Sequence, residues 1–156
     1  MIRLEKHTWV LVADGEKALF LRNDGGAATP DLTVQRVEQQ DNPRQGDQVS
    51  DRPGRRPDPG MGQRSAMEEA DWHQIAKDRF AAELSEILAR MVRRGRIARL
   101  VLVAPPRSLG ELRAQLDEAV LRAVVAEIPK TLTGHSVPDI RKIVTGDLER
   151  MTPATT

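Results

Sequence analysis

The chain has 156 residues, of which 39 % are hydrophobic and 30 % charged, and its formal net charge is +1. This composition is typical of one globular domain and excludes a globally basic nucleic-acid-binding protein. The absence of cysteine excludes disulfides, thiol catalysis and cysteine-ligated zinc. With no signal-peptide pattern and no apolar run of membrane-spanning length, we expect a cytoplasmic protein that does not contact the membrane.

Three strands are predicted ahead of the first helix. Residues 9–13 form a continuous apolar run that stops at Asp14-Gly15, and residues 17–22 follow closely enough for an antiparallel hairpin. The more polar residues 32–38 predict a third strand at an edge of the sheet, where one side stays in water.

Residues 41–64 break the pattern. They contain four glycines and four prolines, and their only large apolar side chains are Val49 and Met61. Such a segment buries too little surface to offset its ordering entropy. We therefore expect one domain over residues 1–150 that carries a flexible loop at 41–64, followed by a disordered tail at 151–156.

Helices and strands alternate in the rest of the chain. Apolar residues at helical spacing from Trp72 and Ile75 onward predict one long helix that Ser65 caps and that packs on the sheet. A strand at 100–104, a short helix capped by Ser108, a strand at 123–128 and a helix from 137 follow. The predicted fold is α/β, with a mixed sheet of about five strands in the order β-β-β-α-β-α-β-α, covered by helices.

Four segments carry a resemblance to a known family. They read TWVLVAD at 8–14, SDRPGR at 50–55, AME at 66–68 and VLVAPPRSLGELR at 101–113. In this combination they resemble the bacterial host-attachment protein family, named for proteins required for attachment to host cells. The family's basic residue and histidine before Ala-Met-Glu are replaced here by Arg64 and Ser65.

That family in turn is similar to the middle domain of the eukaryotic and archaeal class of peptide-chain release factors. The resemblance implies a Gly-Gly-Gln tip on a long loop ahead of the long helix, and the corresponding residues here are Gly60, Met61, Gly62 and Gln63. It further implies that the backbone N–H of Gln63 helps water to attack an ester. Met61 stands where the first tip glycine is expected, and its Cβ restricts the backbone there.

The arginines of the loop are the second candidate site. Between residues 52 and 64, Arg52, Arg55, Arg56 and Arg64 are accompanied by one acidic residue, Asp58. Guanidinium groups on a loop can bind RNA phosphates, whereas the absence of aromatic residues from the loop removes base stacking. The alternative is a solvated polar loop without a partner.

Other residues give weaker indications. Asp14 is either half of a metal-binding carboxylate pair or part of a hairpin turn, and the turn is the simpler interpretation. The three histidines have no paired-ligand spacing, so we expect no metal site, and no cofactor motif is present. Because ligands of open α/β sheets bind beyond the carboxyl ends of strands, a pocket near Arg107 is an alternative to a plain turn there.

Three functions remain open from the sequence. The first is an RNA- or ribosome-binding module that contacts the ribosome or tRNA through Arg52, Arg55, Arg56, Gly60, Gly62 and Arg64. The second is a hydrolase of release-factor type that acts on peptidyl-tRNA through Gln63. The third is an adhesion-linked regulator that binds a protein partner without catalysis.

Overall fold

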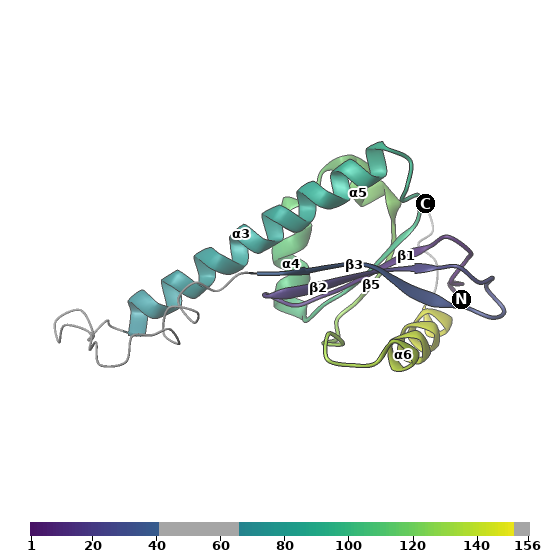
Figure 1. Ribbon diagram of the computed structural model, residues 1–156. Coiled ribbons are helices and arrows are strands. Elements are labelled where there is room, and N and C mark those ends of the chain that lie inside the picture. Colours follow the sequence, from purple (N-terminus) through teal and green to yellow (C-terminus); the bar gives the residue numbers. More distant parts are fainter. Residues whose placement is uncertain (41–65, 152–156) are drawn as a thin grey trace.

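The computed structural model describes residues 1–40 and 66–151, with the side chains of the long helix described from residue 71 onward. Within these residues five strands and four helices form three layers (Figure 1). In chain order they are β1 (Trp9–Ala13), β2 (Lys17–Asn23), β3 (Leu32–Gln39), α3 (Ala66–Arg93), β4 (Leu100–Val103), α4 (Pro106–Gln115), α5 (Glu118–Ala123), β5 (Val124–Ile128) and α6 (Val137–Arg150).

The sheet is mixed and open, with strand order β3-β2-β1-β4-β5. The β1–β2 and β2–β3 pairs are antiparallel, whereas β4 pairs in parallel with β1 and β5. This confirms the predicted fold class and the edge position of β3. Antiparallel pairing follows from the short turns between the first strands, and parallel pairing from the helical crossovers.

Each face of the sheet carries its own core, because successive side chains of a strand point to opposite faces. Trp9, Leu11 and Ala13 lie under α3, α4 and α5, whereas Val10 and Val12 pack toward α6. All five residues of β1 are buried. The continuous apolar run that predicted a strand buried on both faces is thereby explained by β1 lying at the centre of the sheet.

The second half of the chain differs from the prediction at α5. The strand predicted from residue 123 begins at Val124, and a helix over Glu118–Ala123 precedes it. The side chain of Asp117 begins this helix by accepting the Val120 N–H at 3.0 Å. Six residues are too few to display a helical period, so the helix was missed. The order is therefore β-β-β-α-β-α-α-β-α.

The predicted cap of α4 is also wrong. The helix begins at Pro106, Pro105 stands at the cap position, and no side chain caps the helix. Ser108 therefore lies inside the first turn. Proline is favoured at the first helical position because its missing N–H would have no partner there. By contrast, Ser136 is a true cap of α6, since its hydroxyl accepts the Asp139 N–H at 3.2 Å.

A buried asparagine fixes the segment before β1 to the turn after β2. The Nδ2 of Asn23 donates to the carbonyls of Leu4 at 2.9 Å and Glu5 at 3.1 Å. Its Oδ1 accepts the N–H groups of Gly25 at 3.1 Å and Asp31 at 2.7 Å. Asn23 is fully buried, so these four bonds replace all the hydrogen bonds it would make to water.

Candidate functional site

The candidate site residues all lie outside the described residues. They are Arg52, Arg55, Arg56, Gly60, Gly62, Gln63 and Arg64. Ser65, which was expected to cap the long helix, lies outside them too, as do residues 152–156 of the predicted tail. The structure therefore defines the site through the two elements to which residues 41–65 attach, the end of β3 and the start of α3.

The residue that follows β3 is hydrogen-bonded to α3 at Ala76. Gln40, directly after the strand, donates its Nε2 to the carbonyl oxygen of Ala76 at 2.7 Å. Its backbone N–H donates to the carbonyl of Glu16 at 2.7 Å. Because an α-helix rises 1.5 Å per residue, Ala66 lies about 15 Å further along the helix axis than Ala76. Gln40, the last described residue before residues 41–65, thus lies at the flank of α3, and the first described residue after them, Ala66, begins the same helix.

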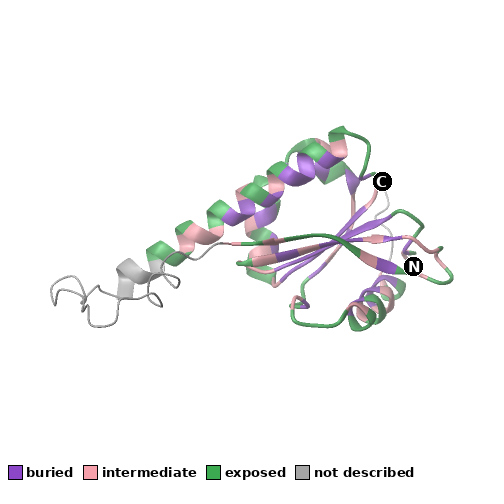
Figure 2. Ribbon diagram, in the orientation of Figure 1, coloured by how far each residue is buried: buried purple, intermediate pink, exposed green. Residues whose placement is uncertain are grey.

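The half of α3 that carries this attachment extends beyond the sheet (Figure 1). Among the helix side chains that are described, from residue 71 onward, Phe80 is the first that is fully buried, whereas Trp72 and Ile75 are 40 % and 50 % exposed. Figure 2 shows the same change along the helix, from exposed to buried side chains. The predicted packing of α3 on the sheet is therefore confirmed from Phe80 onward and wrong for Trp72 and Ile75, because the helical spacing of apolar residues continues past the end of the sheet.

Side chains of α4 brace the extending half of α3. Arg107 donates to Gln74 Oε1 at 3.0 Å, and Gln74 Nε2 donates to Glu111 Oε2 at 2.8 Å. The guanidinium Nε of Arg107 lies 3.6 Å from the same Glu111 oxygen. Arg107 is thus engaged between the two helices. It does not line the hollow at the carboxyl ends of β1 and β4.

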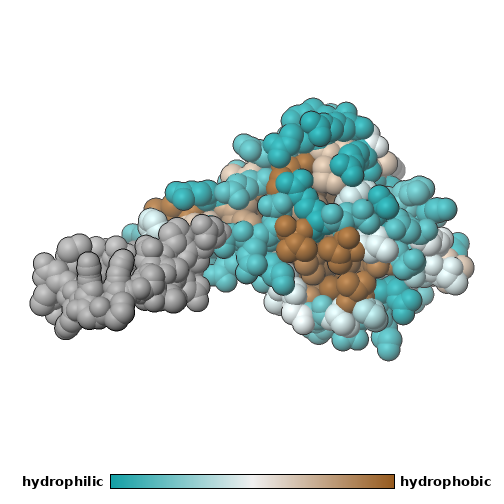
Figure 3. All heavy atoms as spheres, in the orientation of Figure 1, coloured by the Kyte–Doolittle hydropathy of each residue, from teal (hydrophilic) through white to brown (hydrophobic). Residues whose placement is uncertain are grey.

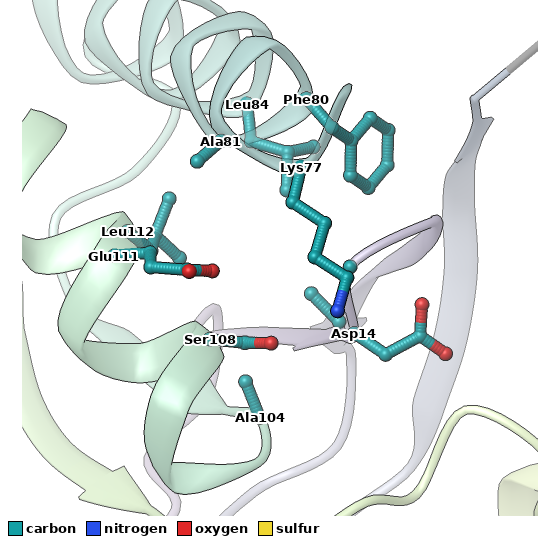
Figure 4. Close-up of a pocket in the computed structure, with 11 residues that line it drawn as sticks. Asp14, Lys77, Phe80, Ala81, Leu84, Ala104, Ser108, Glu111 and Leu112 are labelled. Atoms are coloured by element: carbon teal, nitrogen blue, oxygen red, sulfur yellow. The ribbon is translucent and has the colours of Figure 1, made fainter. Parts of the chain in front are cut away.

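That hollow lies between α3, α4 and the β1–β2 turn (Figure 4). Apolar side chains, including those of Phe80 and Leu84, form one wall, and Asp14, Lys77, Ser108 and Glu111 supply its polar groups. A pocket beyond the strand ends was one of the two alternatives for this region. Its internal volume is about 20 Å³, which leaves room for about one water molecule and no substrate.

Asp14 holds the hairpin turn. Its Oδ1 accepts the N–H groups of Glu16 at 2.7 Å and Lys17 at 2.8 Å, and its Oδ2 accepts the Thr133 hydroxyl at 2.7 Å. These bonds confirm the turn interpretation. Among residues 1–40 and 66–151 no group of three or more histidine, aspartate or glutamate side chains is placed to hold a metal ion.

Lys77 is the one polar lining residue that the sequence interpretation missed. Its stem passes over Gly15, where a Cβ would stand 3.1 Å from the Lys77 Cγ. The signal was present in the sequence, because Lys77 falls on the same helical stripe as Phe80, Ala81 and Leu84. In Figure 4 its amine points toward the strand ends, between Ser108 and Asp14.

The side chains with shifted pKa values lie outside this hollow. The hydrogen bond from Arg22, followed by that from Thr33, lowers the pKa of the Asp24 carboxyl, and the same bond raises the pKa of Arg22. The hydrogen bond to Glu127 likewise raises the pKa of Arg113. Both arginines therefore stay charged and serve as ion-pair partners.

Comparison with known proteins places the chain in a family. A search of curated proteins found no match, and no helix of the described part is long and apolar enough to span a membrane. The predicted relationship to release factors is confirmed at the level of the family, whereas the host-attachment name is not part of the match. The family model that matches covers residues 7–144, and the chain belongs to bacterial archaeo-eukaryotic release factor family 12.

Proposed function

We propose that the protein is a cytoplasmic RNA-binding module of release-factor type that contacts the ribosome or tRNA through residues 41–64. The observation that carries this proposal is the family match over residues 7–144, a range that includes β3, the segment 41–64 and α3. The sequence resemblance implies that this segment corresponds to the loop of the release-factor middle domain that carries the Gly-Gly-Gln tip.

The chemistry of the segment favours the phosphate backbone of RNA as its ligand. Arg52, Arg55, Arg56 and Arg64 supply planar donors that match phosphate oxygens in pairs. Since the segment contains no aromatic residue, it offers no platform for stacked bases. Gly60 and Gly62 allow the backbone to approach RNA closely. We therefore expect binding that depends strongly on salt and weakly on base sequence.

The test measures binding to ribosomes and to tRNA as a function of salt concentration. The variant Arg55→Gln/Arg56→Gln removes two charges from the segment. Arg141→Gln/Lys142→Gln removes two exposed charges from α6 and is the matched control. Each lost phosphate contact lowers the slope of log K against log salt by about 0.7 to 0.9. We expect a loss of about 1.5 in the first variant and none in the control. Wild-type protein that binds neither ribosomes nor tRNA at low salt would overturn the proposal.

A hydrolytic role is the second candidate function, because Gly62 and Gln63 match the last two residues of the release-factor Gly-Gly-Gln tip. Met61 argues for contact without catalysis, since a backbone that glycine adopts freely is strained for a side-chain-bearing residue. We expect no release of peptide from peptidyl-tRNA by the wild-type protein. Hydrolysis that is abolished in Gln63→Ala would favour the enzyme instead, and Met61→Gly tests whether the side chain is the obstacle.

An adhesion-linked role through a protein partner is the third candidate, supported by the resemblance to host-attachment proteins. It is the candidate that remains if the wild-type chain ignores ribosomes and RNA. Recovery of a defined protein partner whose binding is unaffected by nuclease treatment would favour it.

A further inference from the structure

The C-terminal end of α3 carries a second concentration of arginines. Five of them, at positions 90, 93, 94, 96 and 99, lie in the last turn of the helix and the loop to β4, which we call the basic turn. No aspartate or glutamate occurs between Glu86 and Glu111. The basic turn lies at the opposite end of α3 from Ala66, and hydrophilic side chains cover that end of the helix (Figures 1 and 3).

The backbone of the basic turn is fixed by hydrogen bonds. Gly95 has φ of 76°, its N–H donates to the Val92 carbonyl at 3.0 Å, and the Arg96 N–H donates to the Met91 carbonyl at 2.9 Å. This is the Schellman arrangement that ends many helices. In addition, the indole N–H of Trp9 donates to the Arg96 carbonyl at 3.0 Å. The arginines therefore project from a turn that is anchored to the start of the central strand.

Most of these charges have no partner of opposite sign. Arg93 lies 3.6 Å from Asp117, whereas Arg90, Arg94 and Arg96 are exposed and make no ion pair in the described part of the chain. Cations near a helix C-terminus are stabilised by the helix dipole. Arg96 stands past the end of the helix, however, so the dipole does not account for it.

A hollow beside the basic turn is lined by side chains of both charges. Arg99 and Arg3 line it together with Glu5, Val124 and Val125. The Nε of Arg99 is buried and has no hydrogen-bond partner among the described residues. A buried donor without a partner is costly in a folded protein.

We propose that the basic turn is a second RNA contact, which binds backbone phosphates of the RNA that residues 41–64 engage; this rests on the proposed function. Arginines without intervening acidic residues suit phosphates, whereas a protein interface also needs an apolar centre. The ends of α3 are 27 residues apart along the helix, or about 40 Å at 1.5 Å per residue. An RNA that binds at both ends of α3 has to span that distance.

The experiment compares three variants that each lose two positive charges. They are Arg94→Gln/Arg96→Gln in the basic turn, Arg55→Gln/Arg56→Gln in the segment and Arg141→Gln/Lys142→Gln as the control. Binding of fluorescently labelled tRNA is followed by anisotropy at salt concentrations from about 50 to 200 mM. The basic-turn variant should lose about 1.5 from the salt slope, whereas Arg94→Lys/Arg96→Lys should keep the slope because both charges remain. Thermal melting checks that each variant is folded.

The outcomes separate the two proposals. If the segment variant loses slope and the basic-turn variant matches the control, the basic turn is not an RNA contact and the proposed function stands. If only the basic-turn variant loses slope, the basic turn is supported and the segment is not the contact. Wild-type protein that does not bind tRNA overturns both. If the basic-turn variant loses as much affinity for a poly-glutamate peptide as it loses for tRNA, the basic turn is assigned to an acidic protein and its assignment to RNA is overturned.

Discussion

Gly95 allows a direct test of how the basic turn is held, through the substitution Gly95→Ala. Its φ of 76° lies in the left-handed region, and a Cβ added there would meet no atom within 4 Å. The cost of an alanine is therefore conformational and contains no steric clash. A left-handed residue with a side chain costs about 1–2 kcal/mol, whereas stiffening of the unfolded chain returns about 0.4–1 kcal/mol. We expect a net loss of about 1 kcal/mol in the free energy of unfolding.

Gly110 provides the matched control. It lies inside α4, where an added Cβ also meets nothing within 4 Å. Alanine stiffens the unfolded chain here as it does at position 95, but Gly110 has no left-handed backbone to strain. Gly110→Ala should therefore raise the free energy of unfolding by about 0.5–1 kcal/mol. Gly95→Ala should therefore be less stable and Gly110→Ala more stable than the wild type, and the two variants should differ by about 1.5–2 kcal/mol in their free energy of unfolding.

Urea denaturation followed by circular dichroism measures both variants, and their m-values should equal that of the wild type. Gly95→Asn should lower the free energy of unfolding less than Gly95→Ala does, since asparagine enters the left-handed region more readily. If Gly95→Ala is as stable as the wild type, the turn can end in another conformation and the argument for a fixed turn is wrong.

Three further predictions concern the rest of the fold. Asn23→Ala should lower the free energy of unfolding by about 3 kcal/mol, because the buried Leu4 carbonyl and three partly buried backbone groups lose their partner; a loss below about 1 kcal/mol would mean that water replaces the amide. The lowered pKa of Asp24 means that its pair with Arg22 stabilises the fold above the ordinary carboxyl pKa of about 3.9 and loses this effect as pH falls through the lowered value. The melting-temperature difference between wild type and Asp24→Asn should accordingly close in strong acid, and a constant difference down to about pH 2 contradicts this. Ser136→Ala should cost about 1 kcal/mol in urea denaturation, whereas Ser108→Ala, which removes no cap, should cost clearly less.

The sequence predicts the sheet well because each strand is marked by a pattern within its own residues. The apolar run at 9–13 and the Asp14 turn define the hairpin, and the weak alternation of residues 32–38 marks an edge strand. Features that depend on neighbours were harder to predict. The spacing of Trp72 and Ile75 indicates a helix face, but it cannot show that the sheet ends before reaching them. Likewise, Ser108 and Glu111 have the spacing of a cap, and Pro106 begins the helix earlier.

In the candidate site, too, local patterns could be predicted from the sequence, whereas contacts between distant elements could not. A pocket near Arg107 was one alternative to a plain turn, and the Arg107 guanidinium is held by Gln74 and Glu111 from two helices, a meeting that no local pattern encodes. Arg93 and Arg94 are neighbours in the sequence, at the end of the predicted long helix. Their combination with Arg96 on a turn anchored by Trp9 becomes apparent only when β1 and the end of α3 are seen together.

The two halves of α3 differ in how far they pack on the core, and this difference has a consequence for hydrogen exchange. The helix contains neither glycine nor proline, yet only the part from Phe80 onward is packed on the core. Amide hydrogens of residues 71–79 are therefore expected to exchange with deuterium faster than those of the second half, since local opening there exposes little new apolar surface. A partner that touches the Ala66 end should slow exchange in the first half, whereas one that touches only the basic turn should not. Exchange rates along this single helix would thus report which of its ends is occupied.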